Sequence, residues 1–189
     1  MQRIEINQAQ LQEVRNLLAN VRNGAETAMS RSYNAGVDSA VTITASRINE
    51  KITLNKNTIK SFITKIKART YKLGAAMIIK SNKIPLIQFQ TSSWVPGARP
   101  PGGLTVQIWK DRSAQRFKHA FFAIMPNGHI GIFERRFIKM RNLPIDEMKG
   151  PYLATIYENT PGISDEVEQI SAEKMLKEFE RQTDLLLGR

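Results

Sequence analysis

The chain has 189 residues, of which 41% are hydrophobic and 24% charged, and it contains no cysteine. It is long enough to bury about two-thirds of its unfolded surface as one domain, while the lack of cysteine excludes disulfides, thiolate catalysis and cysteine-based zinc sites. The net charge of +11 favours anionic partners, either nucleic acid or an acidic protein surface.

The charge is unevenly distributed along the chain. Residues 1–145 carry 23 Lys/Arg against 7 Asp/Glu, giving +16, and residues 146–189 carry 5 against 10, giving −5. A basic body therefore precedes an acidic tail, which allows nucleic-acid binding, self-association or simply a well-solvated surface. No segment approaches the roughly 20 apolar residues that span a bilayer, and the N-terminus lacks a signal-peptide core, so we expect a soluble intracellular protein without a membrane partner.

Helical patterns occupy the first third of the chain. Residues 8–22 place leucines and valines on one stripe, and Asn23-Gly24 ends it. Residues 25–50 are rich in Ala, Ser and Thr without proline, which predicts one long helix, either continuous or broken near Gly36. A helical glycine costs about 1 kcal/mol, so Gly36 needs packing against another element or subunit to offset it.

A third helix is predicted over residues 57–69, with Asn57 or Thr58 as its cap and Ile59 and Phe62 on its apolar face. It lies in the most basic segment of the chain, 47–83, which has ten basic residues and one acid, Glu50. This segment either contacts DNA phosphates without sequence preference, or is a solvated face or one that meets an acidic surface such as the helix after Ser164. The candidate contact residues are Arg47, Lys51, Lys56, Lys60, Lys65, Lys67, Arg69 and Lys72.

Strand-like patterns follow over residues 71–80, 84–90 and 104–110, with Pro85 at a strand start or edge. Between the last two runs lies WVPGARPPGGLTV, whose prolines and glycines predict an exposed loop. Its apolar, conformationally restricted residues suit a subunit interface, although the loop can equally fold onto its own domain. The candidate interface residues of this loop are Trp94, Pro96, Pro100 and Pro101.

A β-hairpin is predicted over 121–125 and 130–138, because Asn127-Gly128 between two apolar runs accepts the positive φ of a tight turn. Two proline-marked corners, Leu143-Pro144-Ile145 and Gly150-Pro151, are expected to stop regular structure and to present a surface for subunit contact. The five corner residues Leu143, Pro144, Ile145, Gly150 and Pro151 complete the candidate interface set.

The last predicted element is an acidic helix over 164–187, with Ser164 as N-cap and Asp165 and Glu166 in the first turn. The order of elements predicts an α+β fold: N-terminal helices, one of them long, a mostly antiparallel sheet of about five strands, and an acidic C-terminal helix. We expect one domain over 1–189, helical over 1–70, β-rich over 71–140, and made of the corners and the last helix over 141–189.

No constellation for catalysis, cofactor binding or metal binding is apparent in the sequence. His119 and His129 flank the hairpin without a nucleophile or ligand set at a recognisable spacing, and Asp146 and Glu147 are adjacent rather than facing. The GARPPGG run lacks the lysine-hydroxyl ending of a phosphate loop. A non-enzymatic role is therefore predicted.

The third quarter of the chain resembles the minor tail protein Z, or tail-completion, family of tailed phages and prophages. The matching motifs are Ala120-Phe121, Asn127-Gly128, Phe133-Glu134-Arg135-Arg136, Leu143-Pro144-Ile145 and Gly150-Pro151. The resemblance implies a structural virion protein that completes the head-proximal end of the tail and supports head-tail joining.

The same resemblance implies partners and a location. Six copies in a neck ring are expected, contacting tail terminator, tail tube or head-tail connector proteins, and genomic DNA in the channel is a further expected partner. The protein would reside in the virion tail or neck and, during assembly, in the host cytoplasm. A sequence-independent DNA-binding protein acting through residues 47–83 is the alternative.

Overall fold

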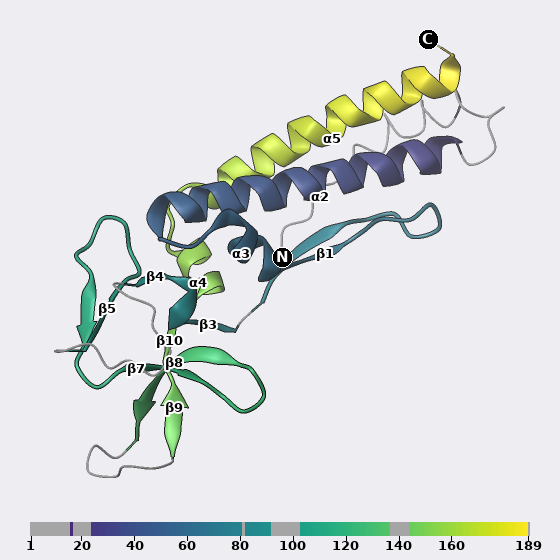
Figure 1. The fold of residues 1–189 in the computed structure, drawn as a ribbon. Helices are drawn as coiled ribbons and strands as arrows, with labels where there is room; N and C mark the ends of the chain where they lie inside the picture. The colour runs from purple at the N-terminus through teal and green to yellow at the C-terminus, as the bar shows by residue number, and fades with distance from the viewer. Residues whose placement is uncertain (1–15, 17–23, 81, 92–102, 137–143, 189) are drawn as a thin grey trace. The chain divides into compact units, whose positions relative to one another are not determined.

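The structure is a computed structural model that describes residues 16, 24–80, 82–91, 103–136 and 144–188 (Figure 1). The chain divides into two compact units. Unit 1 contains the described parts of Met1–Ala45, Ile63–Lys80 and Thr160–Arg189, and unit 2 contains those of Ser46–Phe62 and Ser81–Asn159. The expectation of one domain over 1–189 stays a prediction, and each unit is described by itself.

Unit 1 is built on two long helices that lie side by side, α2 (Gly24–Lys51) and α5 (Ile163–Leu187) (Figure 1). Helix α2 confirms the predicted long helix and continues through Gly36 without a break; its last six residues belong to unit 2. A Cβ added at Gly36 would lie 3.3 Å from Met175 Cβ and 3.3 Å from the Ser171 carbonyl oxygen. The missing side chain therefore lets α5 approach the backbone of α2, which offsets the intrinsic cost of the glycine.

Polar side chains also connect the two helices. Arg31 Nη1 donates to Gln182 Oε1 at 2.7 Å, and Gln182 Nε2 donates to Glu178 Oε1 at 2.7 Å. Arg181 then donates through Nη2 and Nε to the two oxygens of Glu178 at 2.6 and 3.0 Å. Because the Gln182 side chain is buried, both ends of its amide need these partners.

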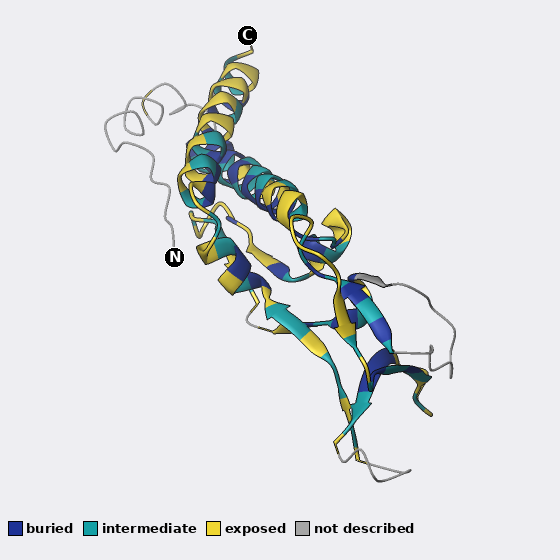
Figure 2. Cartoon of the chain, turned by 90° about the vertical axis from the view of Figure 1, so that its left-hand side faces the viewer, coloured by how far each residue is buried: buried dark blue, intermediate teal, exposed yellow. Residues whose placement is uncertain are grey.

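Apolar residues close one end of the helix pair. Ala28, Met29 and Phe179 form a buried cluster, against which Leu73 of the hairpin described next and Leu186 pack. Buried residues recur along the length of α2 (Figure 2).

The third element of unit 1 is a hairpin of β1 (Ile63–Ile66) and β2 (Ala76–Ile79), paired antiparallel with Lys65 opposite Met77. The predicted helix over 57–69 is therefore confirmed only up to Ser61, and it is wrong beyond Phe62 and in its cap, Asn57 or Thr58. Helix α3 (Lys56–Ser61) ends at its C-cap Phe62, and its N-cap is Asn55, whose side chain accepts from the Asn57 N–H. The run after Phe62 is rich in β-branched residues, which pack well in a strand, and the pairing with β2 decides in favour of the strand.

Unit 2 is mainly β-structure in short antiparallel strands. They are β3 (Lys83–Pro85), β4 (Gln90–Thr91), β5 (Leu104–Gln107), β6 (Gln115–Phe117), β7 (Phe121–Ile124), β8 (Ile130–Arg135), β9 (Ile145–Glu147) and β10 (Lys149–Tyr152), with a 3-10 turn η1 (Leu86–Gln88) and helix α4 (Leu153–Glu158). Their sheets are β10-β3, β4-β5-β6 and β7-β8-β9.

The α+β class and the antiparallel pairing are confirmed, but the expected sheet of about five strands is divided into small sheets. The predicted strands 71–80 and 84–90 do not pair with each other: β2 pairs with β1, and β3 pairs with β10. Buried side chains in the core of unit 2 come from the sheets, among them Phe122, Ile132 and Val106, and from η1, which supplies Leu86.

The Asn-Gly hairpin is confirmed as β7 and β8, with Phe122 opposite Ile132. Its turn differs from the tight form in which both residues take positive φ. The Gly128 N–H donates to the Met125 carbonyl at 2.8 Å, and Gly128 has φ +81°, so Pro126 and Asn127 form the centre of a turn that Gly128 closes. This is the three-residue hairpin loop with glycine in the left-handed position.

The Gly150-Pro151 corner does not stop regular structure, contrary to the prediction, because both residues lie inside β10. In the other corner, Leu143 lies outside the described residues, Pro144 is in no strand, and Ile145 begins β9, which pairs with β8. Proline is tolerated in β10 because the sheet has only two strands and its register shifts between Lys149 and Tyr152.

Helix α5 starts one residue earlier than predicted, with Gly162 as its N-cap at φ +72° and no capping side chain. Ser164 is thus not the cap, whereas Asp165 and Glu166 do occupy the first turn. The predicted helix over 8–22 lies outside the described residues except for Asn16, which is helical.

We expect Gly36→Leu to lower the free energy of unfolding by about 1–3 kcal/mol, because the new side chain must push α5 away from α2. Leucine has the better helix propensity, so a loss of stability can come only from packing. Thr42→Leu, at an exposed position of the same helix, serves as the control and should not destabilise. Chemical denaturation followed by circular dichroism measures both; a Gly36→Leu protein as stable as the control would contradict the close approach.

A second prediction concerns Glu178, whose pKa is lowered from 4.5 to about 2, mainly because Arg181 donates to its carboxylate, with a further donation from Gln182. A depressed folded-state pKa stabilises the protein at pH values above the unfolded pKa, and this contribution is lost as the pH falls from about 4.5 to about 2. The stability difference between wild type and Glu178→Gln should therefore shrink over that range. In Glu180→Gln, the exposed control on the same helix, the corresponding difference should change less; equal changes would refute the assignment.

Candidate functional site

The candidate basic residues fall into two groups. Arg47 and Lys51, at the end of α2, and Lys56 and Lys60, on α3, belong to unit 2, where Arg47 pairs with Glu50 at 3.1 Å. Lys56 Nζ donates to Ser46 Oγ at 3.1 Å. The basic segment 47–83 is thus divided between two units.

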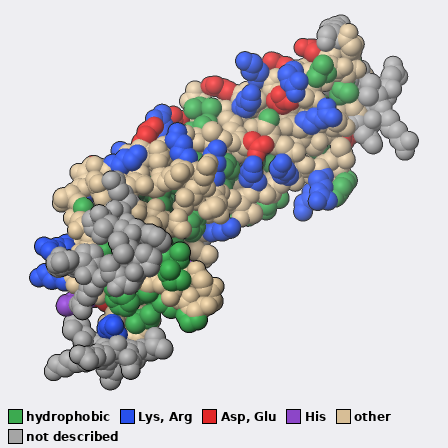
Figure 3. Space-filling model, in the orientation of Figure 1, with side chains coloured by type: hydrophobic (Ala, Val, Ile, Leu, Met, Phe, Trp, Pro, Cys, Tyr) green, Lys and Arg blue, Asp and Glu red, His purple; other side chains and the backbone are tan. Residues whose placement is uncertain are grey.

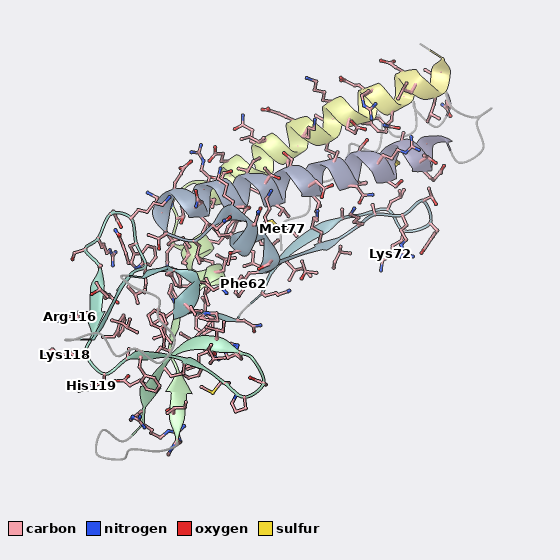
Figure 4. All side chains as sticks on the ribbon, in the orientation of Figure 1. Phe62, Lys72, Met77, Arg116, Lys118 and His119 are labelled. Atoms are coloured by element: carbon pink, nitrogen blue, oxygen red, sulfur yellow. The ribbon has the colours of Figure 1, made fainter. Side chains whose placement is uncertain are left out.

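The second group lies on the β1–β2 hairpin of unit 1. Lys65 pairs with Asp38 of α2 at 2.5 Å, and Arg69 donates to the Tyr71 hydroxyl at 2.5 Å while its guanidinium lies 5.8 Å from the ring centroid. The bond from Tyr71 raises the pKa of Arg69. Lys67 and Lys72 are exposed, and Lys72 lies at the hairpin tip, as Figure 4 shows.

The hairpin is attached to α2 by polar bonds. Asn34 receives the Ala68 N–H at 2.9 Å and donates to the Ala68 carbonyl at 3.1 Å, and Thr44 Oγ1 donates to Met77 Sδ at 3.6 Å. At the tip, Arg69 and Lys72 exchange backbone hydrogen bonds of 3.0 and 2.9 Å. These bonds hold the hairpin as an ordered arm along α2, and Lys and Arg side chains gather over it (Figure 3).

A basic group that the sequence reasoning missed lies in unit 2. Arg116 is in β6, and Lys118 and His119 follow it directly; Figure 4 shows the three side chains near one another. Arg112 also lies nearby in the sequence and stacks at 5.2 Å on the Trp109 ring. The run from 110 to 118, with four basic residues and one acid, was the signal available in the sequence.

The proline-marked corner is positioned by β-pairing. Pro144 is exposed, Ile145, Gly150 and Pro151 are partly exposed, and Arg136 N–H donates to the Pro144 carbonyl at 3.2 Å. Leu143 lies outside the described residues. So do all four loop candidates, Trp94, Pro96, Pro100 and Pro101.

Gly150 is held under an aromatic ring. A Cβ at this position would lie 2.8 Å from Cε2 of Phe89, a side chain that is 4% exposed. The glycine is therefore required for Phe89 to cover β10, and this contact sets the position of the Gly150-Pro151 corner in unit 2.

The two adjacent carboxylates of β9 have different partners. Arg136 donates Nε and Nη2 to the two oxygens of Asp146 at 2.9 and 2.6 Å, which lowers the pKa of Asp146. Glu147 Oε1 lies 2.8 Å from His129 Nε2. These pairs border an open depression of about 500 Å³ lined by Glu134, Arg135, Arg136, Asp146, Glu147 and Met148. The Arg136–Asp146 ion pair and the His129–Glu147 contact thus each join a residue next to an end of β8 to β9.

Within the described ranges, no three His, Asp or Glu residues are grouped so that they could hold a metal ion. No helix among these residues is long and apolar enough to cross a membrane.

We expect Gly150→Ala to lower the free energy of unfolding by about 1–3 kcal/mol, because its methyl group would overlap the Phe89 ring. Phe89→Leu replaces the ring with a smaller side chain and provides the partner for a double-mutant cycle. The double variant should lose less stability than the sum of the two single changes, since the overlap no longer exists. Additive effects in urea denaturation would show that the two residues do not interact.

The comparisons with known proteins identify one family. The family model of prophage minor tail protein Z matches residues 3–188, nearly the whole of the 189-residue chain. Searches of curated proteins and of solved structures gave no match. The chain thus belongs to the prophage minor tail protein Z family and is a structural protein of a phage tail.

Proposed function

We propose that this tail protein completes the head-proximal end of the tail and supports head-tail joining as one subunit of an oligomeric neck ring. The observation that carries the proposal is the family match over residues 3–188, which includes all the hairpin and corner motifs between Ala120 and Pro151. A tail is built around a symmetry axis, and six copies is the number expected for such a ring.

A ring subunit must offer two different surfaces, one for each neighbour, because the contacts around a ring are heterologous. The hairpin of unit 1 has exposed basic and apolar side chains, which supports one of these two contacts. A further surface is the corner of unit 2, which has exposed Pro144 with partly exposed Ile145 and Pro151. We assign the corner, together with Leu143, to contacts with tail tube, tail terminator or head-tail connector proteins.

This function requires no catalysis, and the His129–Glu147 contact and the Arg136–Asp146 ion pair are structural in this proposal. The protein would assemble in the host cytoplasm and remain in the finished virion. Genomic DNA passing through the ring would meet whichever basic side chains line the channel.

Sequence-independent DNA binding by the free protein is the second candidate. It is favoured by the ten basic residues and one acid over 47–83. The structure weakens it because it places these residues on two units and because Arg47 and Lys65 already pair with acids of the chain. Such binding would weaken steeply with added salt.

Deletion of the coding sequence from the phage should yield full heads and separate tails whose head-proximal ends are incomplete, as seen by negative-stain electron microscopy. Purified protein added to an extract of these particles should restore joined, infectious phage, and antibody labelling should place it at the head-proximal end. Thr42→Leu, which has the same net charge as the wild type, serves as the folded positive control in this complementation. Normal joining without the protein, or its absence from purified virions, would refute the proposal.

A further inference from the structure

The β1–β2 hairpin has one face on α2 and one face that is exposed. Lys65 and Met77 are paired across the hairpin and both contact α2, through Asp38 and Thr44. Because side chains alternate along a strand, the residues between them point to the opposite face. This hairpin outer face consists of Thr64, Ile66, Ala76 and Ile78, in which Thr64 is opposite Ile78 and Ile66 opposite Ala76.

The centre of the hairpin outer face is apolar. Ile66 is 43% and Ile78 42% exposed, and Tyr71 at the tip is 76% exposed. Its border is basic, since Lys67, Arg69 and Lys72 are exposed toward the hairpin tip and residues 63–80 contain no Asp or Glu. A β-face with two exposed isoleucines and a cationic border has the composition of a protein interface, with an apolar centre and a charged rim.

A complementary surface runs along α5. The side that faces α2 is buried through Val167, Met175 and Phe179. On the opposite side, Glu173, Leu176, Glu180 and Asp184 follow one another at spacings of three and four residues, which places them on one stripe. Leu176 is 44% exposed. This α5 stripe has an apolar residue between carboxylates, and α5 as a whole carries seven acids and three basic residues.

We propose that the hairpin outer face of one copy binds the α5 stripe of a second copy. Leu176 would pack on Ile66 and Ile78, and the glutamates on either side of it would meet the lysines at the border of the hairpin. The apolar contact supplies the driving force, and the opposite charges fix the partner and its register.

The two surfaces cannot satisfy each other within one chain. Helix α2 contacts α5 at Gly36 and the hairpin at Asn34 and Asp38, so both partners turn their remaining faces away from it (Figure 1). As far as the described residues show, the hairpin outer face and the α5 stripe thus both stay exposed in each copy. A contact between unlike surfaces repeats from copy to copy and forms a ring when the rotation closes. This inference rests on the proposed neck ring and names the surfaces that join its subunits.

The hairpin outer face suits a protein helix better than it suits nucleic acid. Phosphate contacts need cationic donors, and two β-branched apolar side chains at the centre of the face offer none. The same side chains gain from burial against Leu176. A DNA-binding role remains one outcome of the test below, as an alternative to copy-to-copy contact.

Charge exchange in the full chain tests the contact. One double variant changes the hairpin, Lys67→Glu/Lys72→Glu, and another changes α5, Glu173→Lys/Glu180→Lys. Each should weaken self-association, measured by sedimentation velocity, about a hundredfold, because like charges then face each other. An equimolar mixture of the two variants should recover assembly, since each altered surface meets its complement. Lys110→Glu/Lys118→Glu carries the same charge change on unit 2 and should assemble as wild type does.

The absence of cysteine allows a direct proximity test. Ile66→Cys and Leu176→Cys, mixed and oxidised, should form a disulfide between copies, in the free protein or in purified tails. Ile124→Cys, at a 51% exposed position of unit 2, replaces either partner as the control and should not crosslink. Circular dichroism of each variant confirms that it is folded.

Three results would overturn the inference. In the first, the charge reversals leave self-association unchanged. In the second, the mixture does not recover assembly and no crosslink between positions 66 and 176 forms in the free protein or in tails. In the third, the hairpin variant loses affinity for duplex DNA while its assembly stays intact. In each case, protein still found at the head-proximal end of tails would preserve the proposed function. Protein missing from virions would refute that function even if the crosslink formed in solution.

Discussion

The close approach of α2 and α5 at Gly36 is the constraint on which the organisation of unit 1 depends. The 3.3 Å separation between a virtual Cβ there and Met175 leaves no room for a larger residue without movement of a helix. Near this contact, buried Ser32 and Ser171 satisfy their hydroxyls on carbonyls of their own helices, so they add no unpaired polar group to the interface. Small residues, rather than a broad apolar stripe, thus define how the two long helices meet.

This mode of packing has a consequence for the rest of unit 1. With α5 on one side, α2 holds the β-hairpin on another side largely through polar tethers at Asn34, Asp38 and Thr44. A two-stranded hairpin is only marginally stable by itself, so these bonds and the packing of Leu73 against Ala28 and Met29 are needed to order it. They use only one face of the hairpin. The isoleucines on the other face, Ile66 and Ile78, stay 43% and 42% exposed.

Part of this architecture could be predicted from the sequence. The long helix was predictable because nothing between Gly24 and Lys51 interrupts it, and the β7–β8 hairpin was predictable from Asn127-Gly128. The predicted helix over 57–69 was too long because Ile59, Phe62, Ile63 and Ile66 fit a helical stripe, although the last two lie in a strand. The pairing that decides between these periods joins Ile63 to Ile79, and no local pattern contains that information.

The candidate surfaces show the same division between local and long-range information. That Lys65, Lys67, Arg69 and Lys72 would be exposed followed from composition, but the apolar centre between them appeared only when the register placed Ile66 and Ile78 on one face. The corner motifs were found as Leu-Pro-Ile and Gly-Pro, yet their role in β9 and β10 depends on strands far away in the chain. One of these, β3, pairs with β10 across more than sixty residues.

A ring subunit needs a fixed angle between the surfaces that it presents to its two neighbours, since a loose angle would allow open chains of variable curvature. In unit 1 that angle is set by α2, which holds α5 through Gly36 and the Arg31–Gln182–Glu178 bonds and holds the hairpin through paired bonds to Asn34. The acidic helix α5 is therefore held against α2. Its outward carboxylates and the outward cations of the hairpin lie on separate faces of one framework, an arrangement that favours assembly between copies over neutralisation within a copy.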